Sequence, residues 1–413
     1  MTRLLNWLLL GYLALFPFGQ LARLPITFFD SPEVSIYLTD LVVVLISVIY
    51  LIGIWQGKFK WPPLAGNILG FLLAALLSLS AASFWLGWRE LFVSFLYLIR
   101  LASYILLYGT VYNLARNKPT RKTLLNSLIL LGVVLAVFGW LQYIFLSDIR
   151  PLTIFGWDEH YKRIVGTFLD PNFTAIILVL ALILTPGVKT RDILIWLFLF
   201  VTLLFTYSRS GYGAILIGMS VVSWMTRKPV FLATSLLLIL SGILFLPRPA
   251  GEGVRLSRTT SIELRLQNWQ EALTIFKSSP LLGVGFDTLR YVRQDSLSHA
   301  AAGVDNSILF ILVTTGVIGL VIFLSLIVRI WIIFGRKREI MVLASLSAVI
   351  FHSMFTNSLF YPWVLGWMAI LFCARIPRSS AAGMNARKNL SRFLRDTPLL
   401  AVGRDSLGSK VKS

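Results

Sequence analysis

Twelve apolar stretches, each near the length of a membrane-spanning helix, dominate this sequence. A spanning helix needs about 20 mostly apolar residues, because that length crosses the hydrocarbon core. The stretches are 4–20, 38–55, 63–83, 91–114, 124–146, 172–187, 192–207, 211–226, 229–246, 307–334, 340–355 and 359–374. Only 14% of the residues are charged, against roughly 25% in a soluble domain. We therefore predict an all-α, polytopic membrane protein with about 12 transmembrane helices. A soluble enzyme, a disordered chain and a disulfide scaffold are excluded, the last because Cys373 has no partner cysteine.

Lysine and arginine gather in alternate loops between these stretches. The basic loops contain Lys58 and Lys60; Arg116, Lys118, Arg121 and Lys122; Lys189 and Arg191; Arg227 and Lys228; and Arg336, Lys337 and Arg338. The positive-inside rule places them, with both termini, in the cytoplasm. We interpret the excess of 38 basic over 18 acidic residues as topology and contact with membrane lipids, not as nucleic-acid binding. Residues 1–374 are predicted to form the membrane domain, and 375–413 a basic, disordered cytoplasmic tail.

The remaining segments then face outward, and 247–306 is the one large external loop. It contains enough apolar residues to dock, so we expect it to be ordered. The spans contain almost no carboxylates away from their ends, which argues against an ion-driven transporter. Arg100 is the one charge well inside a span, where we expect it to pair with a carbonyl or a hydroxyl such as that of Ser103. The working groups are therefore expected at the outer face.

Two external segments each present an arginine. Arg163 is followed by Gly166-Thr-Phe-Leu-Asp170-Pro171-Asn172, in which Asp170 and Pro171 also fit a simple helix start. Arg209 lies between Ser208 and Ser210 in a tight turn. It is either an arginine that extends toward lipid headgroups or a preorganised site for a phosphate, which guanidinium binds with a planar fork of donors.

The long external loop contains an amphipathic segment. Apolar residues recur at 262, 266, 269, 273 and 276, which is one face of a helix. Arg265 lies about 60° from the centre of this stripe at 100° per residue, and Trp269 is expected to anchor the helix. Pro280, Gly283 and Gly285 follow it in a turn.

The same loop ends with His299 and with Asp305-Asn306, directly before a stretch that contains Gly316 and Gly319. A lone external histidine at such a place is as often incidental as functional. The external segments contain no His, Asp and Glu at the spacing of metal ligands, so no metal site is expected.

These segments, in this order, resemble the O-antigen ligase and O-antigen polymerase family of bacterial envelope glycan enzymes. The motifs that carry the resemblance lie in 160–325: Arg163 with Gly166-Thr-Phe and Pro171-Asn172; Ser208-Arg209-Ser-Gly; Arg265 with Trp269 and Pro280-Leu-Leu-Gly283-Val-Gly285; and Asn306 with Gly316 and Gly319. In the family a histidine directly precedes the asparagine, whereas Asp305 stands there in this chain.

The resemblance implies a glycosyltransferase at the outer face of the inner membrane, without cofactor or metal. Its donor would be a glycan on undecaprenyl diphosphate, and its acceptor a hydroxyl of a lipid (ligase) or of another glycan (polymerase). It assigns the diphosphate to Arg209 and Arg265, then Arg163, with Asn172 and Asn306 beside the substrate. Asp305 or His299 would be the base, and position favours the first while chemistry favours the second. A non-enzymatic flippase for lipid-linked oligosaccharides stays open as the alternative, and a membrane scaffold as a weaker one.

Overall fold

The computed structural model describes residues 1–24, 35–155, 157–185, 189–247, 252–293 and 303–376, and His299 and the tail 377–413 lie outside these ranges. Residues 1–375 form one compact unit. Its long helices are α1 (Thr2–Leu15), α2 (Leu38–Trp55), α3 (Ala65–Ala81), α4 (Trp88–Leu114), α5 (Lys118–Phe145), α6 (Pro171–Leu184), α7 (Thr190–Leu204), α8 (Arg209–Thr226), α9 (Val230–Phe245), α10 (Thr260–Ser278), α12 (Ser307–Gly335), α13 (Ile340–His352) and α14 (Pro362–Arg375). The prediction of an all-α membrane protein is confirmed.

Each of the twelve predicted stretches coincides with a helix of the structure. Six are long and apolar enough to cross a membrane: α1 with its 3-10 extension η1 (Phe16–Ala22), α2, α3 with η2 (Ala82–Phe84), α4, α5 and α12. Four shorter apolar helices are α6, α9, α13 and α14. The count of twelve spans stays a prediction, because α6 to α9, α13 and α14 do not meet this length and hydropathy criterion.

Short elements connect these helices. They are β1 (Arg23–Leu24), β2 (Ile36–Tyr37), η3 (Arg150–Phe155), η4 (Gly166–Phe168), η5 (Glu252–Val254), α11 (Leu289–Val292) and η7 (Ser358–Phe360). The two strands pair antiparallel, with Arg23 opposite Tyr37 and Leu24 opposite Ile36. They lie where the chain enters α2.

Helix α6 lies at the centre of its neighbours. Every residue from 174 to 184 is buried, and the helix packs against α5, α7, α8 and α13. A helix that is apolar on all sides belongs inside a bundle. The start of α6, at Asp170, Pro171 and Asn172, therefore lies in the middle of one end of the bundle.

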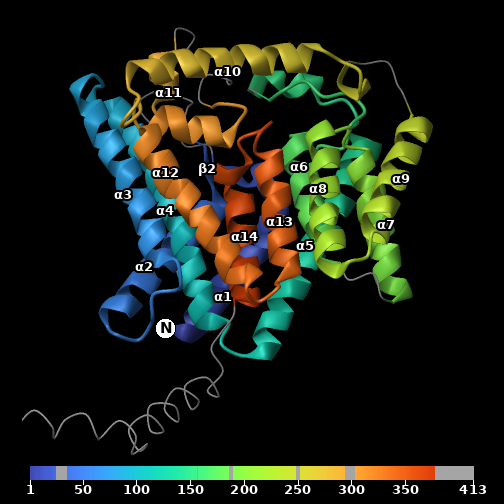
Figure 1. Cartoon of the computed structure of the whole chain (residues 1–413), viewed down its shortest axis with the longest axis horizontal. Helices are drawn as coiled ribbons and strands as arrows, with labels where there is room; N and C mark the ends of the chain where they lie inside the picture. Colours follow the sequence, from blue (N-terminus) through green and yellow to red (C-terminus); the bar gives the residue numbers. More distant parts are fainter. Residues whose placement is uncertain (25–34, 156, 186–188, 248–251, 294–302, 377–413) are drawn as a thin grey trace, which may run out of the picture. The chain divides into compact units, whose positions relative to one another are not determined.

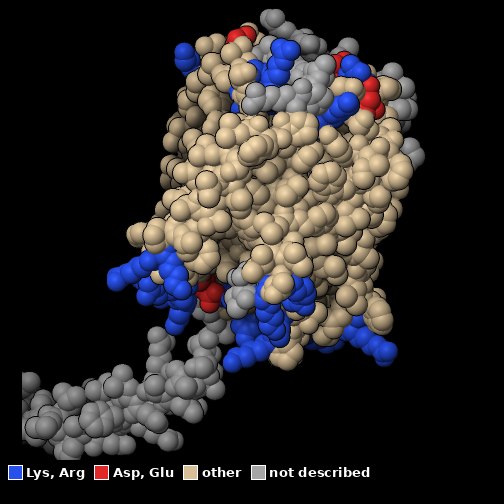
Figure 2. Space-filling model, turned by 90° about the vertical axis from the view of Figure 1, so that its right-hand side faces the viewer, with Lys and Arg blue, Asp and Glu red and all other residues tan. Residues whose placement is uncertain are grey.

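Helix α10 lies across one end of the bundle, at the opposite end from the N-terminus (Figure 1). On the face in Figure 2, Lys and Arg side chains gather at the two ends, and the described residues in the broad band between them show no charge. This distribution is what a chain embedded in a bilayer requires, because a charge at bilayer depth is costly.

Helix α12 is broken at Gly316, whose φ of 67° and ψ of −171° are open to glycine and strained for other residues. The segment 280–285 fills the break. The amides of Val284 and Gly285 donate to carbonyls 313 and 314, and amides 317 and 318 donate to the carbonyls of Pro280 and Leu281. Irregular backbone at membrane depth is tolerated where protein satisfies its polar groups. The two glycine motifs of the sequence are therefore one structural unit, which also anchors the end of α10.

The buried charge of α4 has a carbonyl partner, as expected, and a carboxylate partner besides. Arg100 donates to the carbonyl of Ser35 and also pairs with Asp40 of α2 at 2.8 Å. Tyr104 donates to the same carboxylate. The ion pair joins α2 to α4. Because Arg100 is paired, it does not offer a free charge to the polar route through the membrane that a flippase needs.

Candidate functional site

The predicted site residues that the structure describes, all except His299, meet at the end of the bundle that α10 covers. The starts of α6, α8 and α12 and the end of α13 converge there, as the hydrogen bonds described below show. Each helix start is capped by a side chain, since Asp170 caps α6, Ser208 caps α8 and Asn306 caps α12. The first amides of a helix need such acceptors. Asn306, expected beside the substrate, therefore has a structural contact through its side-chain oxygen.

Arg265 lies on the inward face of α10. The buried or half-buried residues Trp269, Ala272 and Phe276 follow it at intervals of four, three and four, and pack against the core cluster around α12. The predicted helix is confirmed, but its predicted apolar stripe is only partly the packing face. Trp269 and Phe276 pack inward, whereas Ile262, Leu266 and Leu273 remain exposed. The predicted stripe did not include Ala272, whose small side chain lets α10 approach α12 closely.

Arg265 faces Asp305 across a distance of 4.0 Å from Nε to Oδ2, with side chains 22% and 53% exposed. The Arg265 Nε atom is buried and makes no hydrogen bond within the part of the chain that the structure describes. The backbone around Asp305 is fixed, because its amide donates to Asn268 and its carbonyl accepts from Trp269. Arg265 and Asp305, both predicted site residues, therefore form a pair in which the arginine can still donate a hydrogen bond to a ligand.

Arg209 is held by the segment that precedes α10 and by the first turn of α10. Its Nη1 donates to the carbonyls of Leu256 and Arg258 at 3.2 and 2.9 Å, and Nη2 donates to Ser261 at 2.6 Å. Burial lowers the pKa of Arg209, and so does the nearby Arg265 guanidinium. The two arginines are thus close enough to repel, and an anion between them would relieve that repulsion.

Arg163 lies beneath the Arg209 turn and is only 5% exposed. Its guanidinium donates to the carbonyls of Thr206 and Tyr207, at 2.9 and 3.4 Å. Burial lowers its pKa to about 9, and the Arg258 guanidinium adds to the effect, so the group is still charged at neutral pH. These bonds hold Tyr207 in a left-handed conformation with φ of 49°, which is strained for a bulky residue. Arg163 therefore supports the turn from below.

Asn172 also contacts the turn. Its side-chain oxygen accepts from Ser208 Oγ at 2.8 Å and from Ser210 Oγ at 3.4 Å. The two hydroxyls are 3.1 Å apart. The starts of α6 and α8 are thereby fixed to each other.

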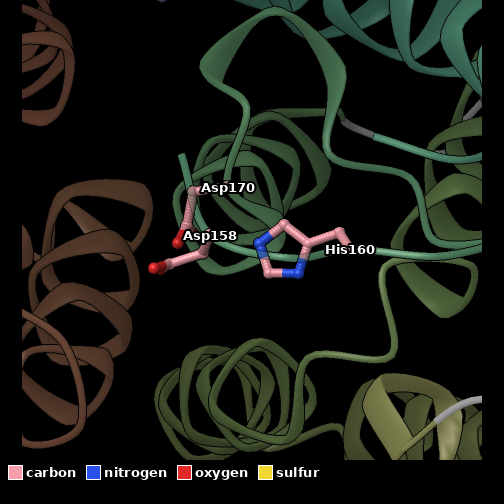
Figure 3. Close-up of side chains that lie close together, drawn as sticks. All are labelled: Asp158, His160 and Asp170. Atoms are coloured by element: carbon pink, nitrogen blue, oxygen red, sulfur yellow. The ribbon is translucent and has the colours of Figure 1, made fainter. Parts of the chain in front are cut away.

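Three side chains of metal-ligand type converge here, which corrects the expectation that no such cluster exists. The ligand atoms of Asp158, His160 and Asp170 lie within 4.8 Å of one another, with both carboxylates beside the imidazole (Figure 3). The nitrogens of His160 are buried and have no hydrogen-bond partner among the described residues. Burial lowers the pKa of His160 to about 3, so the ring is neutral and able to ligate.

Positive charge is already present beside this cluster. Arg163 and Arg258 both add to the lowered pKa of His160. One oxygen of Asp170 accepts the amides of Asn172 and Phe173, at 2.6 and 2.8 Å. Burial nevertheless raises the pKa of Asp170 to about 6. The cluster can hold a divalent cation. Its carboxylates do not need one to balance their negative charge, because arginines lie nearby.

His352, which no sequence pattern singled out, lies in the hydrogen-bond network of Asn172, Ser208 and Ser210. Its Nε2 is 3.2 Å from Ser210 Oγ, and its Nδ1 is 2.6 Å from Ser358 Oγ. Nothing in the local sequence separates it from an ordinary core histidine, because its partners are 142 and 6 positions away.

The comparisons with known proteins agree with the motifs. Residues 193–324 match the family model described as O-antigen ligase. No curated protein gives a significant match to the chain. The matched region runs from α7 into α12 and contains Arg209, Arg265, Asp305 and Asn306, while Arg163 and Asn172 precede it. Residues 193–324 of this multi-pass membrane protein are thus similar to the O-antigen ligase family.

Proposed function

We propose that the protein transfers a glycan from undecaprenyl diphosphate to an acceptor hydroxyl at the outer face of the inner membrane. The acceptor is a lipid in a ligase reaction or a second glycan in a polymerase reaction. Both termini are cytoplasmic in this proposal, and neither a cofactor nor a metal ion is required. The observation that carries the proposal is the pair formed by Arg265 of α10 and Asp305 before the start of α12.

The reaction needs positive charge near its leaving group. When the bond between the anomeric carbon and the diphosphate oxygen breaks, negative charge develops on the diphosphate. Fixed guanidinium groups stabilise such charge, and removal of one preorganised donor typically costs about 10²–10³-fold in rate. The Nε of Arg265 is buried and has no hydrogen-bond partner among the described residues, which supports this role.

The reaction also needs a base for the acceptor hydroxyl. As the hydroxyl oxygen bonds to the anomeric carbon, its proton passes to the base, and undecaprenyl diphosphate leaves with the electron pair of the broken bond. Burial by surrounding protein raises the pKa of Asp305, although Arg265 opposes the shift. A raised pKa makes the carboxylate a stronger base, which supports Asp305. His299 stays the alternative.

The other predicted substrate residues receive supporting roles. Arg209 contacts the diphosphate from the side opposite Arg265 while it holds the segment before α10. Arg163 and Asn172 keep the Arg209 turn in place, and Asn306 orients the start of α12 beside Asp305.

The test uses the full-length protein in proteoliposomes with an undecaprenyl-diphosphate oligosaccharide and a hydroxyl acceptor. We expect glycan transfer that persists in EDTA. Arg265→Ala should lower the rate at least 10²-fold, and Arg265→Lys should restore it only in part, because an ammonium lacks the planar fork. Lys277→Ala is the matched control, since Lys277 is exposed on the same helix.

Three results would contradict the proposal. Movement of the lipid-linked glycan between leaflets without transfer would favour the flippase. Full activity of Arg265→Ala would make α10 an anchor only. Loss of transfer in EDTA that Mg²⁺ or Mn²⁺ restores would refute metal independence and point to the Asp158, His160 and Asp170 cluster.

A further inference from the structure

His352 is a fully buried histidine with a side-chain partner on each ring nitrogen. It is the last residue of α13 and has an exposed fraction of 0%. One nitrogen contacts Ser210 Oγ and the other Ser358 Oγ. A neutral imidazole has one donor and one acceptor nitrogen, and serine hydroxyls rotate to serve either. The ring is thus fixed in both position and rotation.

His352 bonds to Ser210, the residue that follows Arg209 in the chain. Ser210 is also in contact with Ser208 and Asn172, so one hydrogen-bonded chain runs from α13 through the start of α8 to the start of α6. Ser208 and Ser210 are buried like His352, and Asn172 is half-buried. A buried hydrogen-bond network of this kind specifies one arrangement of the helices that it joins.

The residues after His352 bond to the start of α12, on the side of the site that carries Asp305. The carbonyl of Ser353 accepts from the amide of Ser307 at 2.8 Å, and the Ser307 hydroxyl donates to Asn357 at 2.8 Å. Ser307 is the first residue of α12 and follows Asp305-Asn306 directly. The end of α13 therefore contacts both the turn with Arg209 and the start of α12 with Asp305.

The chemistry of the ring excludes a role as base. Among the described contacts of His352 both partners are hydroxyls, and an imidazolium here would be a buried charge without a counter-ion. A neutral ring can donate and accept, but it gains little by taking a proton. Its contribution is geometric.

We propose that His352 is a positioning residue that sets the Arg209 turn relative to Arg265 and Asp305. Its bond to Ser210 carries this role, and its bond to Ser358 orients the ring. The use of this geometry in glycan transfer rests on the proposed function above. A displacement of about 1 Å at a catalytic group can cost about 10²-fold in rate.

Two substitutions separate the two bonds. His352→Gln places an amide near the Nε2 position and can keep the contact with Ser210. His352→Asn places one near the Nδ1 position and keeps only the contact with Ser358. Ser210→Ala removes the same contact from the other side. Ser347→Ala is the control, because Ser347 lies on α13 and, among the described residues, its hydroxyl bonds only to its own helix at Leu343.

Two readouts are measured on full-length protein in nanodiscs. In glycan transfer at saturating donor, His352→Asn and Ser210→Ala should lose about 10²-fold, while His352→Gln and the control stay within a few-fold of the wild type. In hydrogen exchange by mass spectrometry, residues 206–212 should exchange faster in His352→Asn and Ser210→Ala, and not in His352→Gln or the control.

Equal losses in the Gln and Asn variants, or unchanged exchange of 206–212 in all of them, would overturn the proposal and leave His352 a packing residue. If the wild type transfers no glycan but the exchange pattern appears, the proposed function fails while the positioning of the turn stands.

Discussion

Gly316→Ala tests whether the break in α12 holds the site together. A Cβ at this position would lie 2.0 Å from the carbonyl oxygen of Leu281, and real Cβ atoms do not approach within 3.0 Å. The backbone φ of 67° adds strain of about 1–3 kcal/mol for a residue other than glycine. Relief of the clash requires the segment 280–285 to move away.

The four backbone hydrogen bonds across the break are then at risk. At about 1 kcal/mol each, loss of two to four of them with the strain gives a destabilisation of about 3–7 kcal/mol. That is a large part of an ordinary folding free energy of about 5–15 kcal/mol. With roughly 2 °C for each kcal/mol, we expect the unfolding midpoint to fall by about 6–14 °C.

The measurement is thermal unfolding of the purified protein in detergent at one fixed scan rate, because unfolding of such proteins is commonly irreversible. Gly335→Ala is the matched control. It lies at the end of the same helix, and a Cβ there would meet no atom within 4 Å, so its midpoint should change little. If Gly316→Ala melts within 2–3 °C (about 1 kcal/mol) of this control, the segment 280–285 does not stabilise the break.

Three further predictions concern the site and the topology. Asp305→Asn should slow transfer about 10²–10⁴-fold and His299→Gln should not; the reverse result would make the histidine the base. With Asp305 as the base, the rate should fall as the pH drops through its raised pKa, above the ordinary aspartate range of about 3.9, because only the carboxylate accepts a proton. Arg209→Lys should lower both transfer and the protection of residues 256–261 from hydrogen exchange, since one ammonium cannot span three acceptors; unchanged protection would contradict its structural role. Gln270→Cys should react with an impermeant thiol reagent from outside and Lys337→Cys only from the cytoplasm, and the opposite pattern would invert the topology.

The sequence determined the elements that depend on local composition. Twelve helices appear where the apolar stretches lie, because burial of apolar surface and backbone hydrogen bonding in lipid both require a helix there. The helix that carries Arg265 and the cap at Asp170 were equally readable, since periodicity and capping act over a few residues. The order of Arg209, Arg265 and Asn306 was enough to indicate the family.

Tertiary structure alone decided which side chains meet. Hydropathy fixes where a helix runs, but it does not fix its rotation about its own axis. The pairing of Arg100 with Asp40 depends on that rotation. The burial of Arg163 and the convergence of Asp158, His160 and Asp170 depend on how the segment between α5 and α6 folds against the helices. The same holds for His352, which contacts Ser210 across 142 positions. Such contacts follow from the packing of α6, α8, α12 and α13 around one another, a property of the assembled bundle that no single stretch of sequence contains.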